Sequence, residues 1–147
     1  MENFSIVKMV IVSILGVIGS FVTELLGGWD TALKTLVICM AIDYATGLIV
    51  AGIFKASKKS ESGTLQSGAG FKGICRKGTT LLIILIAFRL DLTIGSTFIR
   101  NAVIIGYIIN EVLSIVENAG LMGLPIPDAL KNGIDALATK NEIKKGE

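Results

Sequence analysis

The sequence predicts an all-α integral membrane protein with about four transmembrane helices and a C-terminal amphipathic helix. Of its 147 residues, 52% are hydrophobic and only 18% are charged, and the mean hydropathy is +0.72. A soluble domain of this length carries about 25% charged residues. Four apolar blocks approach the roughly 20 residues that cross a bilayer core of about 30 Å. Their approximate spans are 6–26, 33–54, 78–93 and 101–118.

The first apolar block, 6–26, follows a short charged start, as the apolar run of a signal peptide does. No A-x-A-like cleavage site follows it, so we expect the block to be retained. Its polar interruptions make it the weakest of the four predicted spans, and three transmembrane helices are the alternative. These interruptions are Lys8, Ser13, Ser20, Thr23 and Glu24.

The second block, 33–54, carries an aspartate, Asp43, near its middle. A carboxylate near the bilayer midplane costs roughly 2.5 to 3.5 kcal/mol, so it normally faces a partner helix or water. Thr46, Gly47 and Ala51 share its helical face, and the spacing of Gly47 and Ala51 lets two backbones approach. Either Asp43 is satisfied inside one chain, or this stripe faces another subunit or a lumen. We favour the second interpretation.

The third and fourth blocks are short for a span, so they are expected to tilt little, thin the bilayer or extend through polar flanks. Arg89 and Asp91 lie near the end of the third block. Being two residues apart on a helix, they point to different sides. We therefore expect both to be intramembrane charge partners of other helices, and a pair between Arg89 and Glu111 is plausible.

The fourth block carries a polar stripe that a lipid-facing helix would not carry. Its members recur at helical spacing and are flanked by two further polar residues. We expect this face to line an oligomer contact or a pore. The stripe consists of Tyr107, Glu111, Ser114 and Asn118, and the flanking residues are Asn110 and Glu117.

The distribution of basic residues predicts the orientation. The connection between the second and third blocks holds six bases against the single acid Glu61, so the positive-inside rule makes it cytoplasmic. The lysine-rich tail is on the same side if the chain crosses four times with both termini inside. Three crossings would place the tail outside. The bases of this loop are Lys55, Lys58, Lys59, Lys72, Arg76 and Lys77.

The chain divides into a membrane domain, 1–126, and a cytoplasmic tail helix, 127–147. Leu130, Ile134 and Leu137 form an apolar stripe in the tail, which predicts an amphipathic helix. This helix either lies on the anionic inner leaflet, which attracts lysines, or packs on its own protein.

No feature of the sequence predicts catalysis. Histidine is absent, no metal-ligand spacing occurs, and no nucleophile and base can be paired, so we expect neither an enzyme, a metal nor a cofactor. The glycine pattern in 68–73 lacks the preceding strand of a dinucleotide site and is interpreted as a connector. Cys39 and Cys75 are expected to be free thiols. No nucleic-acid partner is expected.

Five segments together resemble the toxin-secretion/phage-lysis holin family. The most specific is NEVLSIVEN at 110–118, followed by GLPIP at 123–127. The others are DYATG at 43–47, GICRK at 73–77 and the Leu90–Asp91 pair. The resemblance extends over about 36–137, which is most of the chain.

The resemblance implies a small inner-membrane protein of phages, prophages or clostridial toxin loci. Such proteins form homo-oligomers that permeabilise the cytoplasmic membrane, so that an endolysin or a large toxin is released. Two other functions agree with the residues. A small ion channel or transporter would use Asp43 and Glu111 as ion ligands, and a regulatory antiholin-type membrane partner would have a similar sequence.

Overall fold

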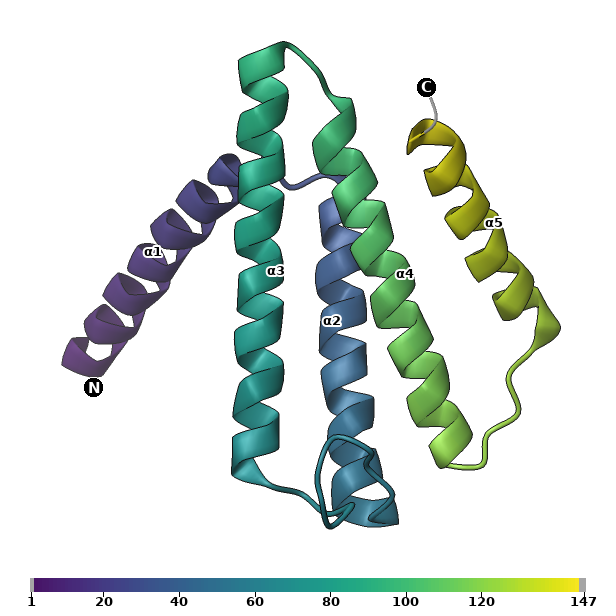
Figure 1. Cartoon of the computed structure of the whole chain (residues 1–147). Coiled ribbons are helices and arrows are strands. Elements are labelled where there is room, and N and C mark those ends of the chain that lie inside the picture. The colour runs from purple at the N-terminus through teal and green to yellow at the C-terminus, as the bar shows by residue number, and fades with distance from the viewer. Residues whose placement is uncertain (1, 146–147) are drawn as a thin grey trace.

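The computed structural model describes the backbone of residues 2–145 and the side chains of residues 5–137 and 139. Within that part of the chain all regular structure is helical (Figure 1), which confirms the predicted fold class. The elements are α1 (Glu2–Leu25), α2 (Thr31–Ile49), the π-helical turn η1 (Val50–Phe54), α3 (Ser67–Ile94), α4 (Phe98–Leu121) and α5 (Asp128–Lys145).

Helix α4 is the centre of the bundle and packs against α2, α3 and α5. Helices α2, α3 and α4 each turn apolar side chains inward, because apolar residues recur every three or four positions. The side chains of Leu33, Leu36, Ile84 and Ile104 are completely buried at the centre of the resulting core. Figure 1 shows α2, α3 and α4 side by side, with α1 projecting away from them.

Helix α1 is an apolar helix with almost no packing partner inside the chain. None of its residues from Ser5 to Leu25 is buried. It is joined to α2 by a tight turn in which Gly27 (φ +88°) and Gly28 (φ +97°) have left-handed backbone conformations. A Cβ on Gly27 would lie 2.7 Å from Nε of Arg100, so a side chain there would meet both strain and a clash.

Three described helices are long and apolar enough to cross a membrane, namely Ser5–Leu25, Thr31–Phe54 and Phe98–Leu121. They match three of the four predicted spans. The remaining predicted span, 78–93, is the apolar part of α3, which begins eleven residues earlier than that span, with a polar and basic first part. The apolar part from Gly78 to Ile94 covers about 25 Å at 1.5 Å per residue, slightly less than a bilayer core.

Helices α2 and α4 begin at the same end of the bundle, because Arg100 in the first turn of α4 contacts Asp30, the N-cap of α2. Helix α3 therefore runs the other way, from the basic connection 55–66 back to the start of α4, as Figure 1 shows. We call these two ends the basic end and the Arg100 end.

Helix α5 runs back along α4 after the connection 122–127 (Figure 1). Its apolar side is only partly covered, since Ile134 is buried whereas Leu130 and Leu137 stay exposed. In the single chain the tail helix contacts α4, and its placement on the anionic inner leaflet stays a prediction.

Candidate functional site

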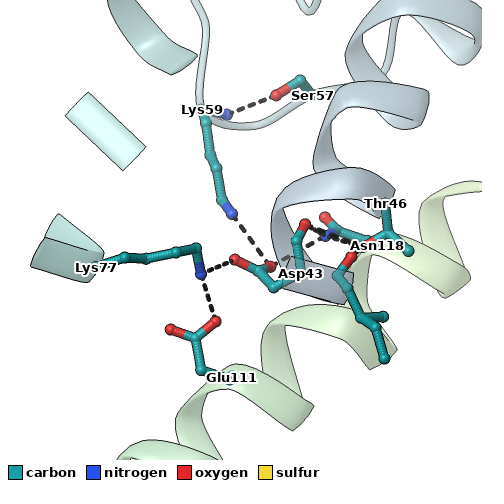
Figure 2. Close-up of polar contacts among 8 residues, drawn as sticks. Asp43, Thr46, Ser57, Lys59, Lys77, Glu111 and Asn118 are labelled. Carbon is teal, nitrogen blue, oxygen red and sulfur yellow. Dashed lines mark hydrogen bonds and ion pairs between the residues drawn. The ribbon is translucent and has the colours of Figure 1, made fainter. Parts of the chain in front are cut away.

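Three helices contribute to a group of interacting charged side chains half-way along the bundle (Figure 2). Nζ of Lys77, on α3, lies 2.8 Å from Oδ2 of Asp43 on α2 and 2.5 Å from Oε2 of Glu111 on α4. Nζ of Lys59, from the connection before α3, lies 3.6 Å from Oδ1 of Asp43. We call these four residues, together with Asn118, the charge network.

Asn118 completes the hydrogen bonding of Asp43 from the side of α4. Its Nδ2 lies 3.0 Å from Oγ1 of Thr46, 3.3 Å from Oδ1 of Asp43 and 3.4 Å from the carbonyl oxygen of Asp43. Both carboxylate oxygens of Asp43 therefore have partners within one chain. A buried carboxylate is tolerated only when it is paired in this way.

The charge network contains two ammonium groups and two carboxylates, so its formal charge is zero. Asp43, Glu111 and Asn118 are buried, whereas the side chain of Lys59 is half exposed. Pairing offsets the desolvation of such groups only while every partner is present, and loss of one partner leaves an uncompensated charge. The network thus couples α2, α3 and α4.

The stripe of Asp43 faces its own chain. Ala51 is buried, and a Cβ on Gly47 would lie 3.8 Å from Nδ2 of Asn118 on α4. Gly47 and Ala51 also border a small cavity that residues of the connection 55–66 help to line. In a single chain, therefore, Asp43 is satisfied internally, and the interpretation that its stripe faces another subunit stays a prediction.

Lys77 is the central residue of the charge network, and the sequence alone does not single it out. It falls among the bases of the predicted cytoplasmic loop. The loop ends earlier than expected, since α3 already begins at Ser67. The signal is present in the sequence, because Lys77 is the last base before the apolar part of α3 and two of the predicted spans carry a carboxylate near their middle.

A polar groove opens beside the charge network, between α3 and α4. It encloses about 690 Å³ and continues into an apolar groove of about 640 Å³, because both share Ile83, Tyr107 and Asn110. We call the whole depression the α3–α4 groove. Its polar half is lined by Lys72, Arg76, Lys77 and Thr80 of α3 and by Tyr107, Asn110, Glu111 and Ser114 of α4.

Most of the predicted polar stripe of α4 thus lies along one groove. Tyr107, Glu111 and Ser114 line it together with Asn110. Asn118 instead turns toward α2. Glu117 is exposed and forms no hydrogen bond or ion pair with the residues that the structure describes.

A second cluster holds the Arg100 end of the bundle together. Arg100 is 5% exposed. Its Nε donates to the carbonyl of Leu26 (2.5 Å), Nη1 to Oδ2 of Asp30 (2.6 Å) and Nη2 to the carbonyl of Gly28 (3.2 Å). This cluster, which we call the Arg100 clasp, fixes the turn between α1 and α2 on the first turn of α4.

Asp30 has two roles in the Arg100 clasp. Its Oδ1 accepts from the backbone N–H of Leu33 at 2.8 Å, which caps α2. Burial raises the pKa of its carboxyl, but the hydrogen bonds from Arg100 and Leu33 outweigh burial and lower the pKa below its ordinary value. The ionised carboxylate is therefore the form that the fold stabilises.

Asp91 and Arg89 do not have the expected partners. The carboxylate of Asp91 accepts from the backbone N–H groups of Ile99 (3.0 Å) and Arg100 (2.8 Å), so it caps α4 rather than pairing with a base. Arg89 is exposed and makes no ion pair within the described side chains. The pair between Arg89 and Glu111, which the sequence leaves open, does not form in the structure, where Glu111 binds Lys77.

The described residues hold no group of three or more His, Cys, Asp or Glu side chains that could bind a metal ion. Cys39 and Cys75 are free thiols, as expected. The candidate site thus consists of the charge network, whose charges neutralise one another, and of the polar surface of the α3–α4 groove beside it.

Residues 20–139 match the bacteriophage holin family, which is most of the chain. The chain belongs to this family. It is 38% identical over 134 residues to an uncharacterized protein of Clostridium perfringens (strain 13 / Type A), covering 88% of this chain and 93% of that one. It is also 38% identical to an uncharacterized 14.9 kDa protein in the nagH 3′ region of Clostridium perfringens, covering 95% and 99% of the two chains.

One more distant relative is a bacteriophage protein. This holin-family chain is 30% identical over 97 residues to a probable holin of Bacillus phage phi105, covering 65% of this chain and 70% of the relative. No solved structure matches the chain. The resemblance read from the sequence is thus confirmed, and with it a membrane protein that is not an enzyme. The charge network and both halves of the groove lie inside the matched region of the holin family.

Proposed function

We propose that this chain is a holin that assembles into a homo-oligomer in the bacterial cytoplasmic membrane and permeabilises it. The released cargo is an endolysin, which then lyses the host, or a large toxin. Membership of the holin family supports the role. The observation that carries the assembly step is the open polar half of the α3–α4 groove, and in particular Asn110.

Asn110 lies in the middle of a candidate span, and its side chain has no partner in the described part of the chain. It is twelve residues from the start of Phe98–Leu121 and eleven from its end. Its amide is exposed and makes no hydrogen bond among the residues described. A primary amide facing hydrocarbon without a partner costs several kcal/mol. Another copy of the chain, or water enclosed between copies, would satisfy it.

The charge network makes the groove the natural face for assembly. Lys77 pairs with Asp43 and Glu111 inside each chain, so these acids need no partner from a second subunit. Free polar groups are left along the groove, and subunits that turn their grooves toward one another would surround a polar space. Apolar faces such as that of α1 would then meet lipid.

The parallel course of α2 and α4 supports four crossings with both termini in the cytoplasm. If these two helices cross in the same direction, α3 must return across the membrane between them. The basic end then lies on the cytoplasmic side by the positive-inside rule. With the basic connection inside, three crossings would result if α3 stayed inside, which places the tail outside, or if α1 did not cross, which places the N-terminus outside.

Expression in bacteria with and without an endolysin tests the proposal. A holin arrests growth abruptly after a delay, and the culture clears only when the endolysin is present. Replacement of Asn110 by Leu should delay or abolish clearing at unchanged protein level, because the polar groove loses its central amide. Asn132→Leu, at an exposed position of α5 outside the groove, is the matched control. Steady growth of the wild-type culture would exclude the proposed function.

A selective ion channel or transporter is less well supported. Its ion ligands would be Asp43 and Glu111, but Lys77 occupies an oxygen of each carboxylate. An antiholin-type partner would not arrest growth in the same experiment, and it would delay lysis when expressed together with another holin.

A further inference from the structure

We propose that the α3–α4 groove of the single chain binds one anionic phospholipid. Its phosphate would contact Lys72 and Arg76, and one acyl chain would follow the apolar half of the groove. The ligand is therefore a lipid of the cytoplasmic leaflet rather than a free phosphate. The inference goes beyond permeabilisation and concerns the single chain before assembly, because a lipid in the groove and a second subunit on it exclude each other.

The charge of the groove favours an anion at its basic end. Four bases and two acids line the polar half. Lys59 and Lys77 are engaged by the two acids, so the surplus positive charge belongs to Lys72 and Arg76. These two side chains are exposed, and in the described part of the chain neither forms a hydrogen bond or ion pair. Being four residues apart on α3, they lie on the same face.

Along its length the groove changes from basic to apolar, as a phospholipid changes from a charged headgroup to apolar acyl chains. Its second half is lined by Ile83 of α3 and by apolar residues from the first turns of α4, and it is continuous with the basic half through shared walls. A free phosphate would fill the basic half and leave this apolar half empty. The lining residues of α4 in the apolar half are Phe98, Ile99, Ala102, Val103 and Gly106.

The direction of the groove also agrees with the orientation of the chain. Its basic half adjoins the polar first part of α3, next to the connection 55–66. Anionic lipids are concentrated in the cytoplasmic leaflet, where basic pockets between transmembrane helices bind their headgroups. Lys72 and Arg76 would thus meet the phosphate from the side on which such lipids are present.

Native mass spectrometry of the purified full-length chain in neutral detergent tests the headgroup contact. Phosphatidylglycerol and phosphatidylcholine with identical acyl chains are added in equal amounts. We expect phosphatidylglycerol to be retained at least about tenfold better, since each base near an anionic headgroup contributes roughly fivefold. The double variant Lys72→Gln/Arg76→Gln should abolish this preference. The control Lys55→Gln/Lys58→Gln removes the same charge from the loop outside the groove and should keep the preference.

A second comparison tests the acyl-chain contact. Gly106 lines the apolar half, so Gly106→Leu should fill it and reduce the retention of long-chain phosphatidylglycerol severalfold. Gly120→Leu adds the same side chain to open space on α4 and should not. With the wild-type chain, dihexanoyl phosphatidylglycerol or inorganic phosphate should displace little of the bound long-chain phosphatidylglycerol. This comparison does not depend on any variant.

Three results would overturn the lipid site. These are equal retention of the two headgroups, an equal loss of preference in both double variants, and equal binding of short-chain and long-chain phosphatidylglycerol. The measurement uses isolated chains and no endolysin. A negative lipid result therefore does not argue against the proposed role in lysis. A negative lysis result likewise does not argue against the lipid site.

Discussion

The ammonium of Lys77 lies 2.5 Å from a carboxylate oxygen of Glu111, so a base at the start of the apolar part of α3 neutralises an acid in the middle of α4. The same ammonium contacts Asp43 of α2 at 2.8 Å. One ammonium group thus pairs with two carboxylates, which lie on two different candidate spans. The three helices are therefore expected to lose stability together when this cation is removed.

Lys77→Met should be strongly destabilising. The variant leaves two buried carboxylates with only the half-exposed Lys59 nearby, and removal of one partner of a buried pair costs about 3 to 5 kcal/mol. Thermal unfolding in detergent, followed by circular dichroism, measures the effect. Lys58→Met, at an exposed loop position, should change stability by no more than about 0.5 kcal/mol. Equal melting temperatures of the two variants would show that the contacts of Lys77 do not stabilise the fold.

Glu111→Gln should be milder than Lys77→Met in stability but should alter the time of lysis. Lys77 keeps its contact with Asp43 in this variant, so no buried cation is left alone. The groove wall changes from an acid to an amide, which changes the surface that we propose for assembly. The measurement is the optical density of a culture that also carries an endolysin.

Glu117→Gln is the matched control for this experiment, because Glu117 is exposed on the same helix and outside the groove. We expect it to lyse at the wild-type time. A wild-type lysis time of Glu111→Gln at normal protein level would mean that Glu111 serves the fold alone.

Arg100→Lys should loosen the Arg100 end of the bundle. One ammonium cannot reproduce the three directions in which the guanidinium donates, to Leu26, Gly28 and Asp30. A lost hydrogen bond to a charged group costs about 1.5 to 3 kcal/mol. We therefore expect the free energy of unfolding to fall by about that amount, which lowers the melting temperature. Arg89→Lys, at an exposed position of α3, should melt like the wild type.

The helices could be predicted from the sequence because each block is predominantly apolar and is bounded by glycine or charged residues. The length of α3 could not, since its first part is polar and resembles a loop when helical packing against α2 and α4 is not known. This explains why Lys77 was assigned to the basic loop. Its role depends on tertiary contacts between residues that are 34 positions apart.

The candidate site was predicted in part. Asp43 and the polar face of α4 were recognisable, because charged and amide side chains are costly in lipid wherever they occur. Which of them meet was not recognisable. Asp91 resembles an intramembrane charge in the sequence, but it caps the next helix across a short connection. Arg100 resembles a lone charge in a turn, although it is buried among backbone carbonyls.

The Arg100 clasp should weaken in acid. The pKa of Asp30 is lowered in the folded chain, so its contribution to stability is fully present above the unfolded-state pKa of about 3.9 and is lost as the pH falls through the lower folded-state value. Asp30→Asn keeps a capping side chain for α2 but removes the charge opposite Arg100. Asp30→Ala removes both.

We therefore expect the stability loss of Asp30→Asn to be present at pH 7 and to shrink when the pH is lowered below about 4. Asp30→Ala should lose an additional 0.5 to 2 kcal/mol, roughly independent of pH, because the cap itself is absent. Urea titrations at several pH values measure both effects. A pH-independent difference between wild type and Asp30→Asn would contradict the lowered pKa.

The crossing number can be measured by labelling single cysteines from outside intact cells, after Cys39 and Cys75 have been replaced by Ser. Four crossings with both termini inside expose the turn before α2 and the turn before α4 to the outside. Trp29→Cys and Thr97→Cys should therefore react with a membrane-impermeant maleimide. Ser5→Cys, Lys58→Cys and Lys144→Cys should react only after the cells are opened.

Each alternative gives its own pattern in this labelling experiment. A reactive position 5, with the other positions as expected, would mean that α1 does not cross and that three spans remain. A silent position 97 with a reactive position 144 would mean that α3 stays inside, which conflicts with its antiparallel course between α2 and α4. A reactive position 144 with a reactive position 97 would mean that α5 follows α4 back across the bilayer. The lysines near the end of α5 make this last pattern the most costly, since each charge at bilayer depth costs about 2.5 to 3.5 kcal/mol.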